Sequence, residues 1–251
     1  MEAPRDARIQ FGRGNYKLGP GVMTWSLSAL DSCPGKSETC SAKLEGGTTR
    51  CYAMRGRMKA HQASYRENLK FSRKPGFGAW LIAEILRRKV KMLRVHVSGD
   101  FYSLAYTKAW LRAMRECCDT HFYLYSRSWR IPGYTELFAE MAKLPNVSVW
   151  FSVDRSTGYP PVIPENVRVA YLAVDDADSQ AIDPRYTDLL FRDYPSRSSV
   201  LRSVQGRPVC PHENGKDNHV TCTDCGICTT PKARPERRAQ IADGRIALTV
   251  L

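Results

Sequence analysis

Seven of the nine cysteines fall into two groups, one near each end of the chain. The first group is Cys33, Cys40 and Cys51, with the spacing Cys-x6-Cys-x10-Cys. The second group is Cys210, Cys222, Cys225 and Cys228, whose core is Cys-x2-Cys-x2-Cys. Thiolates at such short spacing bind zinc or an iron–sulfur cluster. Because three thiolates leave one iron of a four-iron cluster open, the first group predicts a site that takes a further ligand. Four thiolates predict a closed site.

The second group admits more than one metal. Its Cys-x2-Cys-x2-Cys core and the pair Cys210-Pro211 resemble bacterial ferredoxins, which favours a second 4Fe-4S cluster. A zinc knuckle with the same four cysteines is the alternative, and His212 or His219 could replace one of them. The two groups could also fold together and share a single site.

The composition of the chain limits which classes of binding partner and which cellular compartment are expected. The formal net charge is +13 and the pI is about 9.5, which is compatible with a polyanionic partner such as DNA or RNA and equally with a solvated cationic surface. No apolar run is long enough to cross a bilayer, and the first residues lack the apolar core of a secretory signal. We therefore expect a cytoplasmic protein without membrane contact, in which cysteines bind metal rather than form disulfides.

The cysteines must be positioned by alternating strands and helices. The predicted strands are 22–30, 93–98, 122–126, 147–153 and 167–174, with 245–251 as a possible sixth. The predicted helices are 49–72, 77–90, 103–118 and 134–144. This alternation predicts an α/β fold, a partial (βα) barrel with parallel strands. The expected organisation is an N-terminal arm (1–21), the partial barrel with its three-cysteine loop (22–200), and a cysteine-rich metal-binding region with the tail (201–251).

Three of the predicted strands carry a polar row. Because side chains alternate along a strand, each row shares one face. The rows are Arg94, His96, Ser98 and Asp100; Tyr123, Tyr125 and Arg127; and Ser148, Trp150, Ser152 and Asp154. Polar residues become denser toward the carboxyl ends of the strands, where Asp175 also lies, and barrels build active sites at that edge. The rows predict a shared lumen; the alternative is that they face solvent at the edges of a sheet. His96 could be a hydrogen-bonded structural histidine or a catalytic one.

A three-cysteine loop after the first strand, followed by parallel strands with polar faces, resembles the radical S-adenosylmethionine superfamily. There the three cysteines hold a 4Fe-4S cluster, whose fourth iron binds S-adenosylmethionine. The cysteine spacing here is wider than is usual in that superfamily. The resemblance implies that Ser98, Gly99 and Asp100 receive the methionine end of this cofactor. It also implies cofactor contacts for Ser152 and Asp175, and catalytic roles for His96, Arg127 and Asp154.

The chain more closely resembles the gene product 88 family of phage and actinobacterial proteins. The resemblance runs over most of residues 15–230, in order. Its motifs are Ser32-Cys33-Pro34, Cys40, Cys51-Tyr52-Ala53, His96-Val97-Ser98-Gly99-Asp100-Phe101, Tyr125-Ser126-Arg127 and the C-terminal cysteines. It implies little about activity. If a phage encodes the chain, the compartment is the host cytoplasm.

Two functions are therefore expected from the sequence. The first is an iron–sulfur, radical S-adenosylmethionine-like enzyme that receives electrons from a reductant and acts on an unknown substrate related to nucleic acid. The second is a non-catalytic protein that binds DNA or RNA and has structural zinc or iron–sulfur sites. The polar strand faces favour the enzyme, and the wide spacing of the first three cysteines favours the binding protein.

Overall fold

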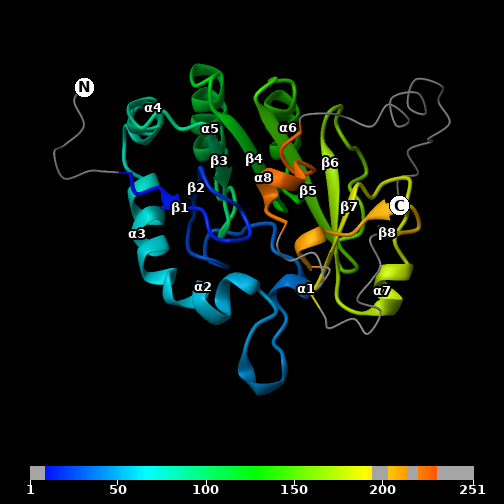
Figure 1. Ribbon diagram of the computed structural model, residues 1–251. Coiled ribbons are helices and arrows are strands. Elements are labelled where there is room, and N and C mark those ends of the chain that lie inside the picture. The colour runs from blue at the N-terminus through cyan, green and yellow to red at the C-terminus, as the bar shows by residue number, and fades with distance from the viewer. Residues whose placement is uncertain (1–8, 194–202, 214–219, 231–251) are drawn as a thin grey trace.

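The computed structural model describes residues 9–193, 203–213 and 220–230 (Figure 1). Within them, one seven-stranded sheet has its strands in the order of the chain, β1 to β7. The strands are β1 (Gly12–Arg13), β2 (Val22–Trp25), β3 (Met92–Val95), β4 (His121–Ser126), β5 (Val147–Asp154), β6 (Arg168–Ala173) and β7 (Leu189–Arg192). β1 is antiparallel to β2, and all other neighbours are parallel. The predicted mixed α/β fold with a largely parallel sheet is confirmed. Its closure into a partial barrel stays a prediction.

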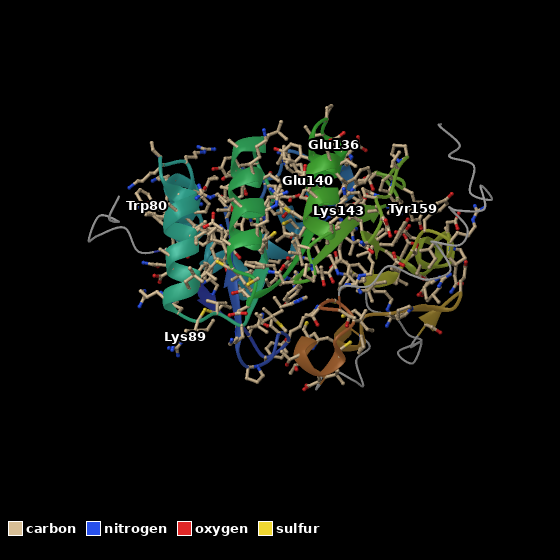
Figure 2. The ribbon with its side chains drawn as sticks, turned by 90° about the horizontal axis from the view of Figure 1, so that it is seen from above. Trp80, Lys89, Glu136, Glu140, Lys143 and Tyr159 are labelled. Carbon is tan, nitrogen blue, oxygen red and sulfur yellow. The ribbon has the colours of Figure 1, made fainter. Side chains whose placement is uncertain are left out.

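Three helices pack side by side on one face of the sheet (Figures 1 and 2). They are α4 (Phe77–Arg87), α5 (Leu104–Glu116) and α6 (Tyr134–Ala142), and they connect β2 to β3, β3 to β4 and β4 to β5. The buried side chains Trp110 and Phe138 meet Phe122 and Phe151 of the strands in this layer. α5 begins where it does because the Ser103 side chain accepts a hydrogen bond from the Tyr106 amide.

The remaining elements are α1 (Glu38–Ser41), α2 (Gly56–Ala60), α3 (Gln62–Ser72), α7 (Asp176–Gln180), α8 (Cys222–Cys225), and the hairpin strands β8 (Ser203–Val204) and β9 (Arg207–Pro208). Apart from α3, which is as long as α4, these elements are short; they lie near the carboxyl ends of the strands, at the sheet edges or, for α8, against the opposite face of the sheet. Single 3₁₀ turns lie at Glu45–Gly47, Tyr52–Met54, Ser128–Arg130 and Pro211–Glu213. Within the described ranges, no helix is long and apolar enough to cross a membrane.

Two predicted elements differ from the structure. The helix predicted over 49–72 is divided into a 3₁₀ turn, α2 and α3, because Arg55 is extended and Gly56 has a φ of +50°. The strand predicted over 22–30 ends at Trp25, and the chain turns away toward Leu30, which has a φ of +67°. The possible sixth strand at 245–251 lies outside the described residues.

The N-terminal segment is joined to the C-terminal cysteine segment. The Cys222 amide donates a 2.8 Å hydrogen bond to the Lys17 carbonyl. Gly19, with a φ of +89°, packs so closely on Thr221 and Thr223 that a Cβ atom would collide with their hydroxyls. The blue N-terminal chain therefore lies next to the orange α8 (Figure 1).

The same C-terminal segment covers the sheet face opposite α4, α5 and α6 (Figure 2). The Trp150 indole donates to the Cys228 carbonyl at 3.0 Å, and the Ser148 hydroxyl donates to the Thr229 carbonyl at 3.0 Å. Arg168 donates to the Ile227 carbonyl at 2.6 Å. The polar side chains of this face are therefore buried under the cysteine segment rather than exposed at a sheet edge.

Candidate functional site

A pocket of about 390 Å³, which we call the cysteine pocket, opens at the carboxyl ends of the parallel strands. All three cysteines of the first group line it. So do six of the predicted site residues after the strands, namely His96, Ser98, Gly99, Asp100, Arg127 and Ser152. The structure thus brings most of the predicted site to one place.

Cys40 is held by a polar network from the end of β5. The Ser37 hydroxyl accepts a hydrogen bond from the Cys40 amide at 2.9 Å and donates to Asp154 at 2.6 Å. The Thr39 amide and hydroxyl both contact the Ser156 hydroxyl. Asp154 itself is fully buried and pairs with Arg127 at 3.1 Å. The carboxylate thus joins the first cysteine loop to two strand ends.

Gln62, on α3, connects the other parts of the cysteine loop. Its side-chain oxygen accepts from the Ala29 amide at 2.9 Å, and its nitrogen donates to the Ala53 carbonyl at 2.8 Å and to Ser98. This buried amide therefore fixes the chain on both sides of the cysteine loop. Ser37 and Gln62 were not expected as site residues, since neither residue type nor local spacing distinguishes them from ordinary surface residues.

The three thiols of the first group differ in acidity. The Cys40 thiol donates to the Cys51 sulfur, which lowers the pKa of Cys51 to about 7. Burial raises the pKa of Cys33 to about 12, and the positive charge of Arg127 partly offsets this shift. Cys51 is therefore the thiol that ionises first, which suits a metal ligand or a nucleophile.

His96 does not share a face with Arg94, and the predicted row is wrong at this residue. Its φ of +64° turns the chain after β3, so the side chain packs against α5. Its Nε2 atom lies 2.9 Å from the Tyr106 hydroxyl, and only 3% of the residue is exposed. These contacts favour the structural role over the catalytic one.

Acid should destabilise the protein through His96. Burial lowers its pKa to about 3 from 6.5, so below pH 6.5 the unfolded chain binds a proton that the folded chain excludes. The contribution of His96 to the free energy of unfolding is then fully present above pH 6.5. It falls by about 1.4 kcal/mol per pH unit as the pH decreases below that value. Urea unfolding between pH 4.5 and 7 measures this. In the His96→Asn variant, where asparagine tolerates the positive φ, the free energy of unfolding should change less with pH than in the unchanged protein. An identical slope in both proteins would contradict this.

Asp100 and Ser98 are bonded within the protein. The Asp100 carboxylate accepts from the Phe101 amide, the Ser126 hydroxyl and the Arg127 amide at 2.7–2.8 Å. The Ser98 hydroxyl donates to the Leu27 carbonyl at 2.9 Å. Both groups fix the turn after β3, and their contact with a cofactor stays a prediction.

Gly99→Ala should be strongly destabilising. The φ of Gly99 is +81°, and a Cβ atom would lie 2.5 Å from the Ser32 hydroxyl and 2.7 Å from the Leu27 Cβ atom. We expect a loss of about 3 kcal/mol or more, from backbone strain and overpacking together. Gly46→Ala is the matched control, because Gly46 has the same φ but open space around it, and it should cost about 1 kcal/mol. Equal losses in urea unfolding would show that the close packing of Gly99 is unimportant.

Asp175 lies apart from the cysteine pocket. Its side chain accepts from the Asp178 amide and so caps α7, and it pairs at 3.1 Å with the exposed Arg155. It is absent from the lining of the pocket, unlike Ser152. The polarity that suggested a cofactor contact is that of a helix cap.

The second cysteine group lies on the covered face of the sheet. Cys228 is half-buried beside the Tyr125 hydroxyl, and desolvation raises the pKa of its thiol to about 11. Cys222 and Cys225 are near enough to raise it further, and Cys210 is held through its amide to the Leu190 carbonyl. Across residues 9–193, 203–213 and 220–230, no three His, Cys, Asp or Glu side chains form a group that could hold a metal ion. The metal at either group stays a prediction.

Unpaired polar atoms lie between the two cysteine groups. The Arg94 guanidinium lies over the rings of Tyr123 and Tyr125, with centroid distances of 5.8 and 5.3 Å. Among the described residues, Arg94 Nε and both tyrosine hydroxyls have no hydrogen-bond partner of good geometry, although Tyr123 lies close to Arg94 and Tyr125 close to the Cys228 thiol. Tyr52 and Cys222 lie close enough to affect the Arg94 charge, so the guanidinium is near members of both regions. Unpaired buried donors beside thiols fit an anionic, thiolate-bound group.

The comparisons with known proteins agree with the motifs. The model of the "Gene product 88" family matches residues 8–231. A "Gene 88 protein" of Mycobacterium phage D29 is 30% identical over 148 residues, which are 57% of this chain and 52% of that protein. A "Gene 88 protein" of Mycobacterium phage L5 is 28% identical over 147 residues, with the same coverage. The chain spans about half the length of these curated relatives.

No solved structure matches the chain. The family match covers most of the sequence, including both cysteine groups and the strands that line the cysteine pocket. The chain therefore belongs to the gene product 88 family.

Proposed function

We propose that Cys33, Cys40 and Cys51 hold a 4Fe-4S cluster and that the chain is a radical S-adenosylmethionine-like enzyme. The observation that supports this most is the meeting of three cysteines, separated in the sequence, at one pocket beside the carboxyl ends of parallel strands. When bound, a cluster with one open iron supplies the electron for reductive cleavage of S-adenosylmethionine. A partial barrel would account for the strand order and for the polar, covered face of the sheet.

The protein's own residues orient the ligands. Asp154 and Ser37 hold the segment of Cys40, and Gln62 holds the chain around Cys51. Gly35 packs on the Arg127 backbone more closely than a side chain would allow, so the segment after Cys33 lies against the end of β4. Arg127 places a positive charge near Cys33 and Cys40, which favours their thiolates.

The second cysteine group would form a closed site, which we assign to a second cluster, with zinc as the alternative. Tyr125 stands beside Cys228 and has a buried hydroxyl available to donate. Hydrogen bonds of this kind tune the potential of a cluster. Because this segment covers the sheet, a metal there would also stabilise the cover.

The proposal is tested by anaerobic purification and reconstitution, followed by iron and sulfide analysis. We expect iron and acid-labile sulfide, an electron paramagnetic resonance signal that changes with S-adenosylmethionine, and 5′-deoxyadenosine after reduction. Stoichiometric zinc without iron would refute the cluster. An intact, reducible cluster that ignores S-adenosylmethionine would refute the enzyme and leave a protein with structural metals.

A further inference from the structure

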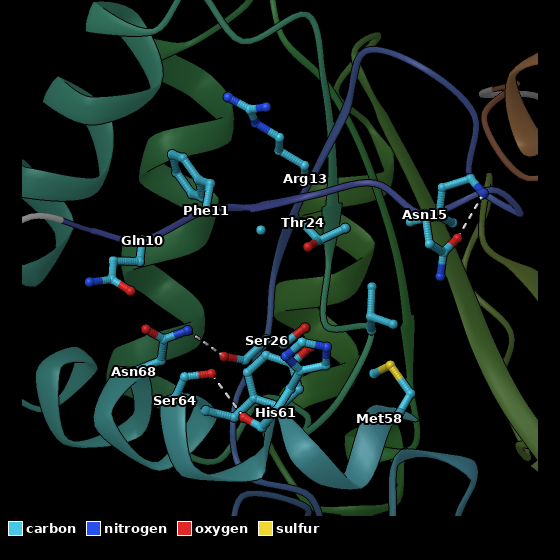
Figure 3. A pocket seen from close by; sticks show the side chains of 14 residues that line it. Gln10, Phe11, Arg13, Asn15, Thr24, Ser26, Met58, His61, Ser64 and Asn68 are labelled. Atoms are coloured by element: carbon cyan, nitrogen blue, oxygen red, sulfur yellow. Dashed lines mark hydrogen bonds between the residues drawn. The ribbon is translucent and has the colours of Figure 1, made fainter. Parts of the chain in front are cut away.

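A second pocket, of about 290 Å³, lies between the N-terminal segment and helices α2 and α3 (Figure 3). We call it the amide groove, because uncharged hydrogen-bonding side chains dominate its lining. These include Gln10, Asn15, Thr24, Ser26, Ser64 and Asn68. Arg13 and His61 are the ionisable side chains there besides Tyr65. No residue proposed above as a metal or cofactor contact lines this groove.

The floor of the amide groove contains an unsatisfied polar atom. Ser26 is 3% exposed, and its hydroxyl has no hydrogen-bond partner of good geometry; the Tyr65 hydroxyl is near enough to interact with it, which partly offsets the rise in the Tyr65 pKa caused by burial. The Asn68 side-chain nitrogen donates to the Ser26 carbonyl at 2.9 Å, which fixes the amide at the floor (Figure 3). Because burying a hydroxyl without a partner is costly, the atom indicates a ligand that bonds to it.

Aromatic rings accompany these polar groups. His61, which joins α2 to α3, and Tyr65 on α3 lie about one helical turn apart, with ring centroids 6.0 Å apart and an interplanar angle of 34°. Phe11 closes another side of the groove. Flat rings beside uncharged donors and acceptors suit a planar, uncharged heterocycle, and a nucleobase is the common one.

The amide groove adjoins the cysteine pocket. Asn15, Leu18, Met58 and Val97 line both. The cysteine pocket is strongly cationic: Lys17, Lys36, Arg50, Arg55, Arg94, Arg127 and Arg192 line it, against Asp100 and Asp193. Asp193 pairs with Arg50 and Arg55, Asp154 pairs with Arg127, and Asp100 is bonded to backbone amides. Such an excess of positive charge favours phosphate.

We propose that the two pockets together bind a nucleotide, with its base in the amide groove and its phosphate toward the cationic wall of the cysteine pocket. This proposal gives the substrate class of the enzyme proposed above. The role of the nucleotide as a substrate, but not its binding, rests on that proposed function. The ligand is a nucleoside monophosphate or the end of a single strand, which present the same base and phosphate.

Binding can be tested on the full chain without metal, so that failure of the cluster and failure of nucleotide binding are distinguishable. Calorimetry would compare nucleoside 5′-monophosphates, the matching nucleosides, ribose 5-phosphate and a short single-stranded oligonucleotide. We expect the monophosphates to bind about tenfold or more tightly than either fragment. An oligonucleotide that binds still more tightly would identify a strand end as the source. No preference for nucleotide over both fragments would overturn the proposal.

Two variants separate the halves of the site. His61→Ala removes an exposed ring and should weaken nucleotide binding about fivefold or more, with ribose 5-phosphate unchanged. Lys36→Gln should weaken the binding of both nucleotide and ribose 5-phosphate, and this loss of affinity should be larger at low salt. Lys59→Gln is the control, because this exposed lysine of α2 lines neither pocket. Thermal unfolding of each variant checks the fold. A His61→Ala protein that is folded and binds nucleotide normally would refute the placement of the base.

Discussion

Cys51→Ala is expected to remove the iron bound by the first cysteine group and to leave the second group loaded. Two 4Fe-4S clusters would give about eight irons per chain, so the variant should retain about four. The reason is that Cys33 and Cys40 alone leave the cluster without its third protein thiolate. Iron, sulfide and electron paramagnetic resonance measurements on the reconstituted variant provide the result.

Cys117→Ala is the matched control for this experiment. Cys117 is also buried, but it packs in the apolar layer under α5, and burial raises the pKa of its thiol to about 11. Its loss should leave the iron content unchanged. If both variants lost the same iron, the loss would reflect instability of the fold, and if neither lost any, the first group would not hold the cluster.

Asp154→Ala is expected to be among the most destabilising substitutions in the chain. The fully buried carboxylate pairs with Arg127 and accepts hydrogen bonds from Ser37, Ser156 and Thr157. Removing it leaves a guanidinium and several donors without their partner, at a cost of about 3–5 kcal/mol. Urea unfolding of the metal-free chain at neutral pH measures the loss.

Asp175→Ala is the companion variant. Asp175 ends a parallel strand in the same way, but its side chain is 50% exposed and its partner Arg155 is also exposed. Only a helix cap and a screened ion pair are lost, so we expect about 1 kcal/mol. Equal losses at the two residues would show that the network around Ser37 does not hold the cysteine loop.

The sequence predicted those parts of the structure that repeat a local pattern. Alternating apolar strands and helices gave the parallel sheet, because crossover units are specified within a few tens of residues. The cysteines after the first strand and the polar strand ends met at one pocket because parallel strands bring their carboxyl ends to the same edge. The position of Asp175 was not predictable in this way, because a helix cap and a ligand contact use the same residue type.

What could not be predicted depended on single backbone angles or on distant contacts. The positive φ of His96 reverses its side chain, and strand alternation cannot reveal such an angle. The cover of the sheet by residues 227–229 depends on bonds from Trp150 and Arg168, which are far away in the sequence. Gln62 holds the cysteine loop through three separate bonds, none of which has a signature in its own helix.

The junction between Lys17 and Cys222 has a consequence for synthesis. The covering segment leaves the ribosome after every strand of the sheet, so Arg94, Tyr123 and Tyr125 remain uncovered while the chain is growing. Once residues 220–230 are made, their docking on the N-terminal segment covers this face of the sheet. Truncation before residue 220 should therefore shift the tryptophan emission to longer wavelength, because Trp150 loses its bond to the Cys228 carbonyl and becomes exposed to solvent.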